Sequence, residues 1–447
     1  MALQEVNFKM RKDHILGLNA RTKISWRYNK PRAKKYANSK LATKRILRKK
    51  DVPVPEIYGK FVKPEKIEKF DWSSLPNAFA LKPNKGLGGE GIIVVKKRAL
   101  DENKKKEKEV WITTQRKRIT SDDLKLHVLD ILEGAFSMGN TPDVAYIEEY
   151  VGRHKSLIKY SYRGTPDIRV IVFNKVPLMA MLRLSTKESG GKANLHQGAI
   201  AVGVDIATGI TTKAYWHGKY IKYKPGTKRK LNGIKIPQFK KVLETAVSAG
   251  EATELGYYGA DVVLHPDKGP MILELNFQPG LSIQLANNAG LRKRFERVED
   301  LDIKDAEHGV KIAKVLFAER FADRVKAEEG VKILKATERV KIYPPGKKGR
   351  YVDARIDSGA LRSSIDRGMA EDMELLTDDN ILWRKRFAYR SATGRQTRPV
   401  IALTIRLAGR KIKTSASVAN RSKLATPLLI GRNDLQGFLI NPVPDEE

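Results

Sequence analysis

Two neighbouring segments with oxygen-bearing side chains are well suited to bind a metal ion. Glu274-Leu-Asn276 ends a short apolar run, and Asp261 begins the apolar run before it. Strand alternation would place Glu274 and Asn276 on one face, with Leu275 turned into the core. Carboxylate and amide oxygens suit magnesium that carries nucleotide phosphates. A strand end with solvated acids fits the same spacing, so spacing alone leaves both interpretations open.

A lysine followed by a glycine-rich turn is the second feature with chemical potential. Lys82 ends a predicted strand, and the turn Gly86-Leu-Gly-Gly-Glu-Gly91 begins four residues later. The N–H groups of such a loop can fold over a triphosphate, while the lysine supplies a positive charge. A plain β-hairpin has the same pattern, so the loop by itself does not decide between the two.

The third feature is Asp357-Ser-Gly359, which ends an alternating run from Val352. Two carboxylates placed at such strand ends can share a proton and activate water. An ordinary turn uses the same residue types, so the motif alone leaves both interpretations open. The chain has one such Asp-[Ser/Thr]-Gly motif. A water-activating pair would therefore need a second chain.

Composition limits the classes of protein to which the chain can belong. Of 447 residues 41% are apolar, and Lys and Arg number 86 against 51 Asp and Glu, a net charge of +35. The absence of cysteine excludes disulfides, thiolate zinc sites and a thiol nucleophile. No apolar run approaches the roughly 18 residues of a membrane span, and the N-terminus lacks a secretory apolar core. We therefore expect a multi-domain cytoplasmic protein without a membrane span.

The elements that must position these residues follow from local patterns. Helices are predicted at 39–50, 121–136, 237–255 and 307–327, and β-rich runs surround Lys82, Asp261 and Glu274. After residue 330 the pattern changes to strands and turns only. The predicted domains are 1–328, with a basic segment at 1–50 and a lysine-rich insertion at 96–118, and 329–447.

Eight motifs in a fixed order give residues 1–325 a specific resemblance. They resemble an ATP-grasp ligase of the RimK-type α-L-glutamate ligase group, which is an α+β fold of two lobes around ATP. The motifs are Asn38-Ser-Lys-Leu-Ala-Thr-Lys44, Val52-Pro-Val-Pro-Glu56, Leu81-Lys-Pro-Asn-Lys-Gly-Leu-Gly-Gly-Glu-Gly-Ile92, Ile147-Glu-Glu-Tyr-Val151, Asp167-Ile-Arg169, Asn194-Leu-His-Gln-Gly198, Gly259-Ala-Asp261 and Leu273-Glu-Leu-Asn-Phe-Gln-Pro-Gly-Leu281.

The resemblance implies a role for each matching residue. Lys44 and Lys82 would contact phosphates under the loop formed by Gly86, Gly88, Gly89 and Gly91. Glu148, Glu149 and the backbone of Tyr150 and Val151 would hold adenine and ribose. Asp261, Glu274 and Asn276 would bind magnesium or manganese, and Arg169, Arg183 and Asn194 would serve the acyl-phosphate end. The implied reaction joins a carboxylate to an amine through an acyl phosphate at the expense of ATP. The segment before the central region is too short and basic to be the family's usual N-terminal domain, so the carboxylate cannot be inferred.

The C-terminal segment has its own resemblance. Asp357-Ser-Gly-Ala360, followed seventy-odd residues later by Leu428-Leu-Ile-Gly-Arg432, is similar to retropepsin-like aspartic peptidases of the RimB-like, "ATP-dependent zinc protease" group. This implies a small all-β hydrolase domain that acts as a homodimer, with Asp357 catalytic and Ser358, Gly359 and Gly431 in support. A zinc site finds no support, because there is no cysteine and only seven histidines are scattered along the chain.

The high positive charge leaves the choice of partner open. The charge can reflect a lysine-rich composition that has no particular partner. It can also serve to attract acidic amino-acid or peptide substrates. Arg362 and Arg432 either lower the pKa of the nearby catalytic carboxyl or bind such a substrate. Nucleic acid or the ribosome is an alternative partner, through 1–50 and 96–118, with a C-terminal domain that only dimerises. No helix-turn-helix, zinc finger or aromatic-rich RNA-binding motif supports this alternative.

Overall fold

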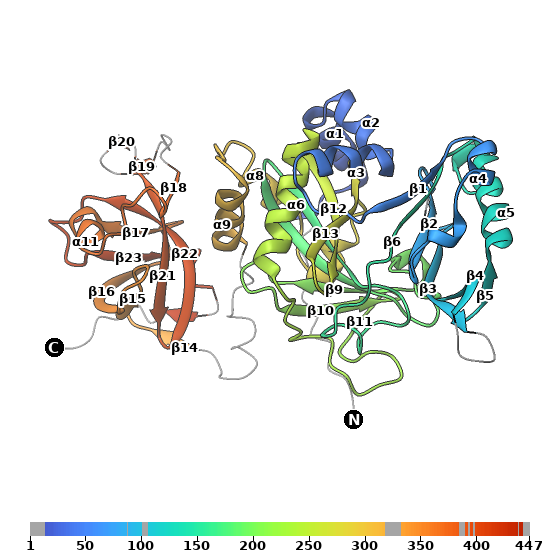
Figure 1. Ribbon diagram of the computed structural model, residues 1–447. Helices are drawn as coiled ribbons and strands as arrows, with labels where there is room; N and C mark the ends of the chain where they lie inside the picture. Colours follow the sequence, from blue (N-terminus) through green and yellow to red (C-terminus); the bar gives the residue numbers. More distant parts are fainter. Residues whose placement is uncertain are drawn as a thin grey trace. The chain divides into compact units, whose positions relative to one another are not determined.

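The computed structural model describes residues 14–86, 88–100, 106–317, 332–383, 389–391, 394–396, 398–436 and 438–440. The chain divides into two compact units, residues 1–310 and 311–447 (Figure 1). Helix α9 (Ala306–Leu316) spans this division. The domain boundary predicted between residues 328 and 329 lies outside the described residues. Within the described part of the chain, no helix has both the length and the apolar character needed to cross a bilayer.

Three short helices open the first unit, shown in blue in Figure 1. They are α1 (Leu18–Tyr28), α2 (Pro31–Ala37) and α3 (Lys40–Lys49), and they pack against α6 and the strands β12 and β13. Ser39 caps α3 by accepting a hydrogen bond from the Ala42 N–H, as the sequence predicts. Helix α3 thereby carries Lys40 and Lys44 towards the end of a neighbouring strand.

An antiparallel sheet of six strands forms the first lobe, in the order β1-β6-β2-β3-β4-β5. The apolar face of helix α5 (Ser121–Leu132) packs on its core, which includes Phe79 and Trp111. A capping box between Thr120 and Asp123 starts α5, which ends before the predicted residue 136. The strands are β1 (Ile57–Phe61), β2 (Phe79–Pro83), β3 (Ile93–Leu100), β4 (Lys106–Thr113), β5 (Arg118–Thr120) and β6 (Ala145–Glu149).

A seven-stranded antiparallel sheet forms the second lobe, in the order β11-β10-β9-β8-β7-β12-β13. Helices α6 (Phe239–Thr253) and α7 (Ile283–Asn287) pack on it, and α8 (Arg292–Glu296) follows. The strands are β7 (Asp167–Phe173), β8 (Val176–Leu184), β9 (Ile200–Val204), β10 (Thr211–Trp216), β11 (Lys219–Ile221), β12 (Tyr257–His265) and β13 (Gly269–Asn276). The nearly continuous apolar burial of β7, β8 and β12 makes this sheet a rigid support for the polar residues at its edge.

The second unit is built around a closed barrel of six strands in the order β15-β16-β23-β17-β22-β21, closed by pairing of β15 with β21. Helix α11 (Arg367–Asp372) corrects the expectation of strands and turns only, because Asp366 supplies a good N-cap. The barrel strands are β15 (Thr337–Ile342), β16 (Arg350–Asp357), β17 (Ser363–Asp366), β21 (Val400–Leu407), β22 (Arg410–Ala419) and β23 (Leu428–Gly431), with β18 (Ile381–Trp383) beside β21 and two small pairs, β14 (Lys332–Leu334) with β24 (Phe438–Ile440) and β19 (Tyr389–Ser391) with β20 (Gly394–Gln396).

A glycine in α6 sets how closely this helix approaches the second lobe. A Cβ added to Gly250 would lie 2.1 Å from the hydroxyl oxygen of Tyr258, a buried side chain on β12. We predict that Gly250→Ala lowers the free energy of unfolding by about 1–3 kcal/mol through overpacking, although alanine is the better helix former.

Gly280→Ala is the control, because Gly280 is exposed and no atom beyond its chain neighbours lies within 4 Å of its added Cβ. Urea unfolding followed by tryptophan fluorescence measures both variants, since four of the five tryptophans lie in residues 1–310. A Gly250→Ala variant as stable as the control would contradict this packing.

Candidate active site

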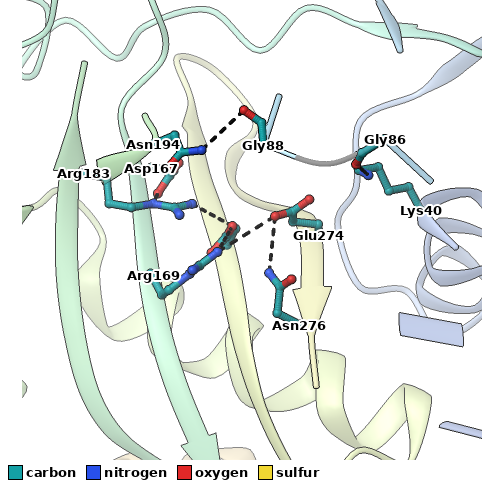
Figure 2. A network of polar contacts seen from close by, with 10 residues as sticks. Lys40, Gly86, Gly88, Asp167, Arg169, Arg183, Asn194, Glu274 and Asn276 are labelled. Carbon is teal, nitrogen blue, oxygen red and sulfur yellow. Dashed lines mark hydrogen bonds and ion pairs between the residues drawn. The ribbon is translucent and has the colours of Figure 1, made fainter. Parts of the chain in front are cut away.

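A cavity of about 880 Å³ lies within residues 1–310 and is lined by residues of both sheets. On the side of the second lobe, the antiparallel register places charged residues directly opposite one another. Arg183 on β8 faces Asp167 on β7, and Asp261 on β12 faces both Arg169 on β7 and Glu274 on β13. Directly opposite residues point to the same face of a sheet, so these side chains form one row across four strands (Figure 2).

Asp261 is held by two arginines. Its Oδ1 accepts a hydrogen bond from Arg169 Nε at 2.6 Å, and its Oδ2 accepts from Arg169 Nη2 and Arg183 Nη2, both at 2.6 Å. Arg183 also donates through Nε to Asp167. The Asp261 side chain is only 3% exposed. The fork geometry of arginine suits this bidentate contact, and it fixes both guanidinium groups at the cavity wall.

The two aspartates of this row have opposite pKa shifts. Burial raises the pKa of Asp167 to about 6, with Arg183 opposing the shift and Asp261 adding to it. Burial would also raise the pKa of Asp261, but Arg169 and Arg183 outweigh it and hold that pKa well below its usual range. Asp261 therefore stays ionised as the common partner of the two arginines.

Glu274 and Asn276 are the most available oxygen ligands of this row. Glu274 is 36% exposed, forms a 3.9 Å ion pair with Arg169 and accepts a 3.3 Å hydrogen bond from Asn276 Nδ2. No cluster of three or more His, Cys, Asp and Glu that could hold a metal occurs in the described ranges. Magnesium needs only one or two carboxylates besides phosphates and water, so this donor set fits it. Asp261 would have to share its oxygens with the arginines.

Two lysines, Lys82 and Lys40, line the cavity, and a third, Lys44, lies buried beside Glu148. Lys82 on β2 and Lys44 on α3 both contact Glu148, the latter with 3.0 Å between Nζ and Oε2. Lys40 was not predicted, yet it lines the cavity and its Nζ donates to the Gly86 carbonyl at 2.9 Å. Lys40 occupies the first position of a capped helix, two residues after Asn38. This position is the sequence feature that could have indicated a site residue.

The glycine loop, which connects β2 and β3, reaches the cavity from the first lobe. Gly88, Gly89 and Gly91 have φ of 61°, 79° and 67°, a backbone region that favours glycine. The Gly88 carbonyl accepts a long hydrogen bond of 3.4 Å from Asn194 Nδ2. Lys40 on α3 and Asn194 in the β8–β9 connection therefore both contact the loop (Figure 2). The predicted loop, Asn194 and the arginines are thus brought together.

The residues predicted to hold adenine and ribose lie along one wall. Glu148, Glu149, Tyr150 and Val151 all line the cavity. Both Glu148 oxygens lie on lysines, and Glu149 pairs with Lys268 and lies 3.5 Å from His265 Nε2. His196, next to Asn194, is exposed.

A separate arrangement occupies the barrel of residues 311–447. Asp357 ends β16 opposite Gly431 of β23, in a parallel pair. Its Oδ1 accepts hydrogen bonds from the N–H groups of Gly359 at 2.8 Å and Ala360 at 3.0 Å. A Cβ on Gly431 would lie 2.5 Å from the backbone carbon of Arg362, so only glycine fits beneath this loop. Ser358 and Arg432 are exposed, and the Arg362 guanidinium lies 4.9 Å from the centre of the Trp383 ring.

Comparison with known proteins gives one family. The family described as "Sugar-transfer associated ATP-grasp" matches residues 19–300. This match confirms the predicted α+β ATP-grasp fold and the ATP and magnesium cofactors. The RimK-type assignment and the retropepsin-like assignment stay predictions. A comparison with curated proteins gives no match.

Several solved structures are similar at low identity. The ATP-grasp ligase PsnB with a minimal precursor is 17% identical, with 59% of each chain covered and a TM-score of 0.31. D-alanine–D-alanine ligase from Bacillus anthracis with ATP is 16% identical over 67% of this chain and 70% of that one, with a TM-score of 0.33. EIAV protease with the inhibitor HBY-793 is 22% identical over 22% of this chain and 84% of that one, with a TM-score of 0.17. The chain spans 59% of the length of PsnB.

The different environments of Asp261 and Glu274 lead to different consequences of mutation. Asp261→Asn removes the charge between two buried arginines, and we predict a loss of about 3–5 kcal/mol in the free energy of unfolding. Glu274→Gln, at a half-exposed position, should change it by no more than about 1 kcal/mol while reducing ATP turnover by orders of magnitude. Urea unfolding and phosphate release measure the two effects. Equal destabilisation by both substitutions would refute this division of roles.

Proposed function

Because the chain belongs to the sugar-transfer associated ATP-grasp family, we propose that residues 1–310 form an ATP-dependent carboxylate–amine ligase of the RimK-like kind. The observation that carries this proposal is the row Arg183–Asp167–Arg169–Asp261–Glu274 facing the glycine loop across one cavity. It combines two fixed arginines with a half-exposed oxygen pair, and no side chain is needed as a covalent nucleophile.

The proposed reaction proceeds in two balanced steps. The substrate carboxylate takes the γ-phosphoryl group of ATP, ADP leaves, and an acyl phosphate is formed. The amine nitrogen then attacks the acyl carbon, phosphate leaves with its bonding electrons, and the amine proton is released. ATP supplies the phosphoryl group and magnesium offsets its charge. The carboxylate and amine would belong to amino acids or peptides, with a preference for acidic ones.

Each group of residues has a task in this scheme. Arg169 and Arg183, held by Asp261, would neutralise the phosphoryl group and the acyl-phosphate oxygens. Glu274 and Asn276, with Asp261, would hold the metal ion. Lys82 and the loop of Gly86, Gly88 and Gly89 would bind the phosphates, with Lys44 adding its charge from behind Glu148, and Glu149, Tyr150 and Val151 would bind the nucleoside. Asn194 would keep the loop against the acyl-phosphate end.

We predict that hydroxylamine traps the acyl phosphate as a hydroxamate. The full-length protein is incubated with ATP, magnesium and a panel of amino acids and acidic peptides, and hydroxamate and phosphate are measured. Glu274→Gln should lose both products, while the exposed substitution Glu254→Gln should keep them. Phosphorylation of a hydroxyl acceptor without any hydroxamate would identify a kinase and overturn the ligase proposal.

For residues 329–447 we propose one half of an aspartic peptidase that is completed by a second chain. The closed six-stranded barrel and the Asp357 loop above Gly431 support this proposal. Two Asp357 carboxyls would share one proton and activate water, with Ser358 and Gly359 shaping the loop. Arg362 follows this loop, and the Arg432 N–H donates to the Ala360 carbonyl at 2.8 Å, so two arginines near the loop favour an acidic peptide.

We predict that Asp357→Asn removes peptidase activity and leaves ligation intact, because the two sites use no common residue. Mixed dimers of wild-type and variant chains should be inactive as peptidases, since one carboxyl cannot form the pair. Sedimentation analysis gives the oligomeric state, and an acidic peptide library gives cleavage. Full activity in mixed dimers, or cleavage by a monomer, would rule out the shared pair.

A further inference from the structure

Glu148 lies between two lysines that come from different elements. It is 1% exposed, on β6, which pairs with β2 so that Ala80 faces Glu148 and Lys82 faces Tyr146. Lys82 is therefore the diagonal neighbour of Glu148 on the same face, and its Nζ donates to Glu148 Oε1. Lys44 reaches the other oxygen from α3, with 3.0 Å between Nζ and Oε2. Both oxygens of the carboxylate are thus taken up by ammonium groups.

Burial disfavours the charged form of a lysine, so the contacts with Glu148 are needed to keep the charge. Burial lowers the pKa of Lys44, and Glu148 opposes that shift, while Lys82 adds to it. Burial would raise the pKa of Glu148, but Lys44 and Lys82 outweigh it and keep the carboxyl ionised. With both lysines protonated, the three groups carry one net positive charge, and Lys82 presents it at the cavity wall. Such a group is complementary to phosphate and unfavourable for a neutral nucleoside.

We propose that Glu148 is a positioning residue for the phosphate-binding lysines, and that it does not contact adenine or ribose. The inference rests on the proposed function only in taking this cavity as the ATP site. The carboxylate holds Lys82 at the cavity wall and keeps Lys44 protonated. Glu149 and the backbone of Tyr150 and Val151 are then left to bind the nucleoside.

Tripolyphosphate and adenosine each represent one part of ATP. Together they distinguish a role of Glu148 in phosphate binding from a role in nucleoside binding. The full-length Glu148→Gln variant is titrated calorimetrically with inorganic tripolyphosphate, with ADP and with adenosine. Loss of one charge-assisted contact at a lysine should weaken tripolyphosphate and ADP binding by about 10- to 100-fold, with adenosine binding unchanged. A loss of adenosine affinity, with or without a loss of tripolyphosphate affinity, would overturn the proposal. So would unchanged binding of all three ligands.

The pH dependence of ADP binding provides a second test, because it would not change if Glu148 only stabilised the fold. Without the Glu148 charge, burial favours the neutral form of Lys44, whose other charged influences are Lys82 and Glu274. A group with a lowered pKa loses its proton as pH rises, so the ADP affinity of Glu148→Gln should begin to fall at a lower pH than that of the wild type. Parallel profiles for the two proteins would contradict the proposed role.

A double variant covers the case in which Glu148→Gln fails to fold. Lys44→Met combined with Glu148→Gln removes the buried charge that has lost its partner, and it should restore folding. Its tripolyphosphate affinity should stay low, because Lys82 still lacks its anchor, and wild-type affinity would overturn the proposal. Glu254→Gln is the control, since Glu254 is exposed and pairs with Lys30 at 3.9 Å. A wild-type protein that binds neither ADP nor tripolyphosphate would instead refute the ATP site itself.

Discussion

The register of four antiparallel strands is the constraint on which the proposed ligase site depends. Asp261 lies opposite Arg169 on one side and Glu274 on the other. Arg183 lies opposite Asp167, so four strands share one polar row. A shift of one residue would send each of these side chains to the opposite face of the sheet. The apolar residues between them, such as Val262 and Val170, are fully buried and hold the register in place. The position of the charges is therefore a consequence of packing.

Several elements that local sequence patterns predict agree with the structure. Helix α3 begins at the predicted cap Ser39, and α6 lies within the predicted range 237–255. Glu274 and Asn276 share a face, as alternation predicts, and Leu275 is buried. The predicted final helix at 307–327 is α9 as far as residue 316, and residues 318–327 lie outside the described part. These features depend on residues close together in the chain, which is why a single sequence suffices.

Side-chain contacts between residues far apart in the sequence could not be predicted in this way. Asp261 and Arg183 are 78 residues apart, and Glu148 and Lys44 are brought together by a helix and a strand of different segments. No local pattern indicates that the carboxylate of Asp261 holds two arginines, or that Lys40 binds the carbonyl of Gly86. Asp167 belongs to the motif Asp167-Ile-Arg169, yet its contact with Arg183 depends on the β7–β8 register. Long-range geometry decides these roles, and it follows from the packing of whole sheets.

Two buried carboxylates of the cavity have the same arrangement, and electrostatics gives a common reason. Asp261 holds Arg169 and Arg183, and Glu148 holds Lys44 and Lys82. A cavity that receives a polyanion gains nothing from a buried bare carboxylate, which would repel the ligand and is itself costly to bury. Surrounded by two cations, the same carboxylate fixes their positions and leaves a net positive charge. Glu274, at 36% exposure, is left for a different task, since a carboxylate can face phosphates only with a metal ion between them.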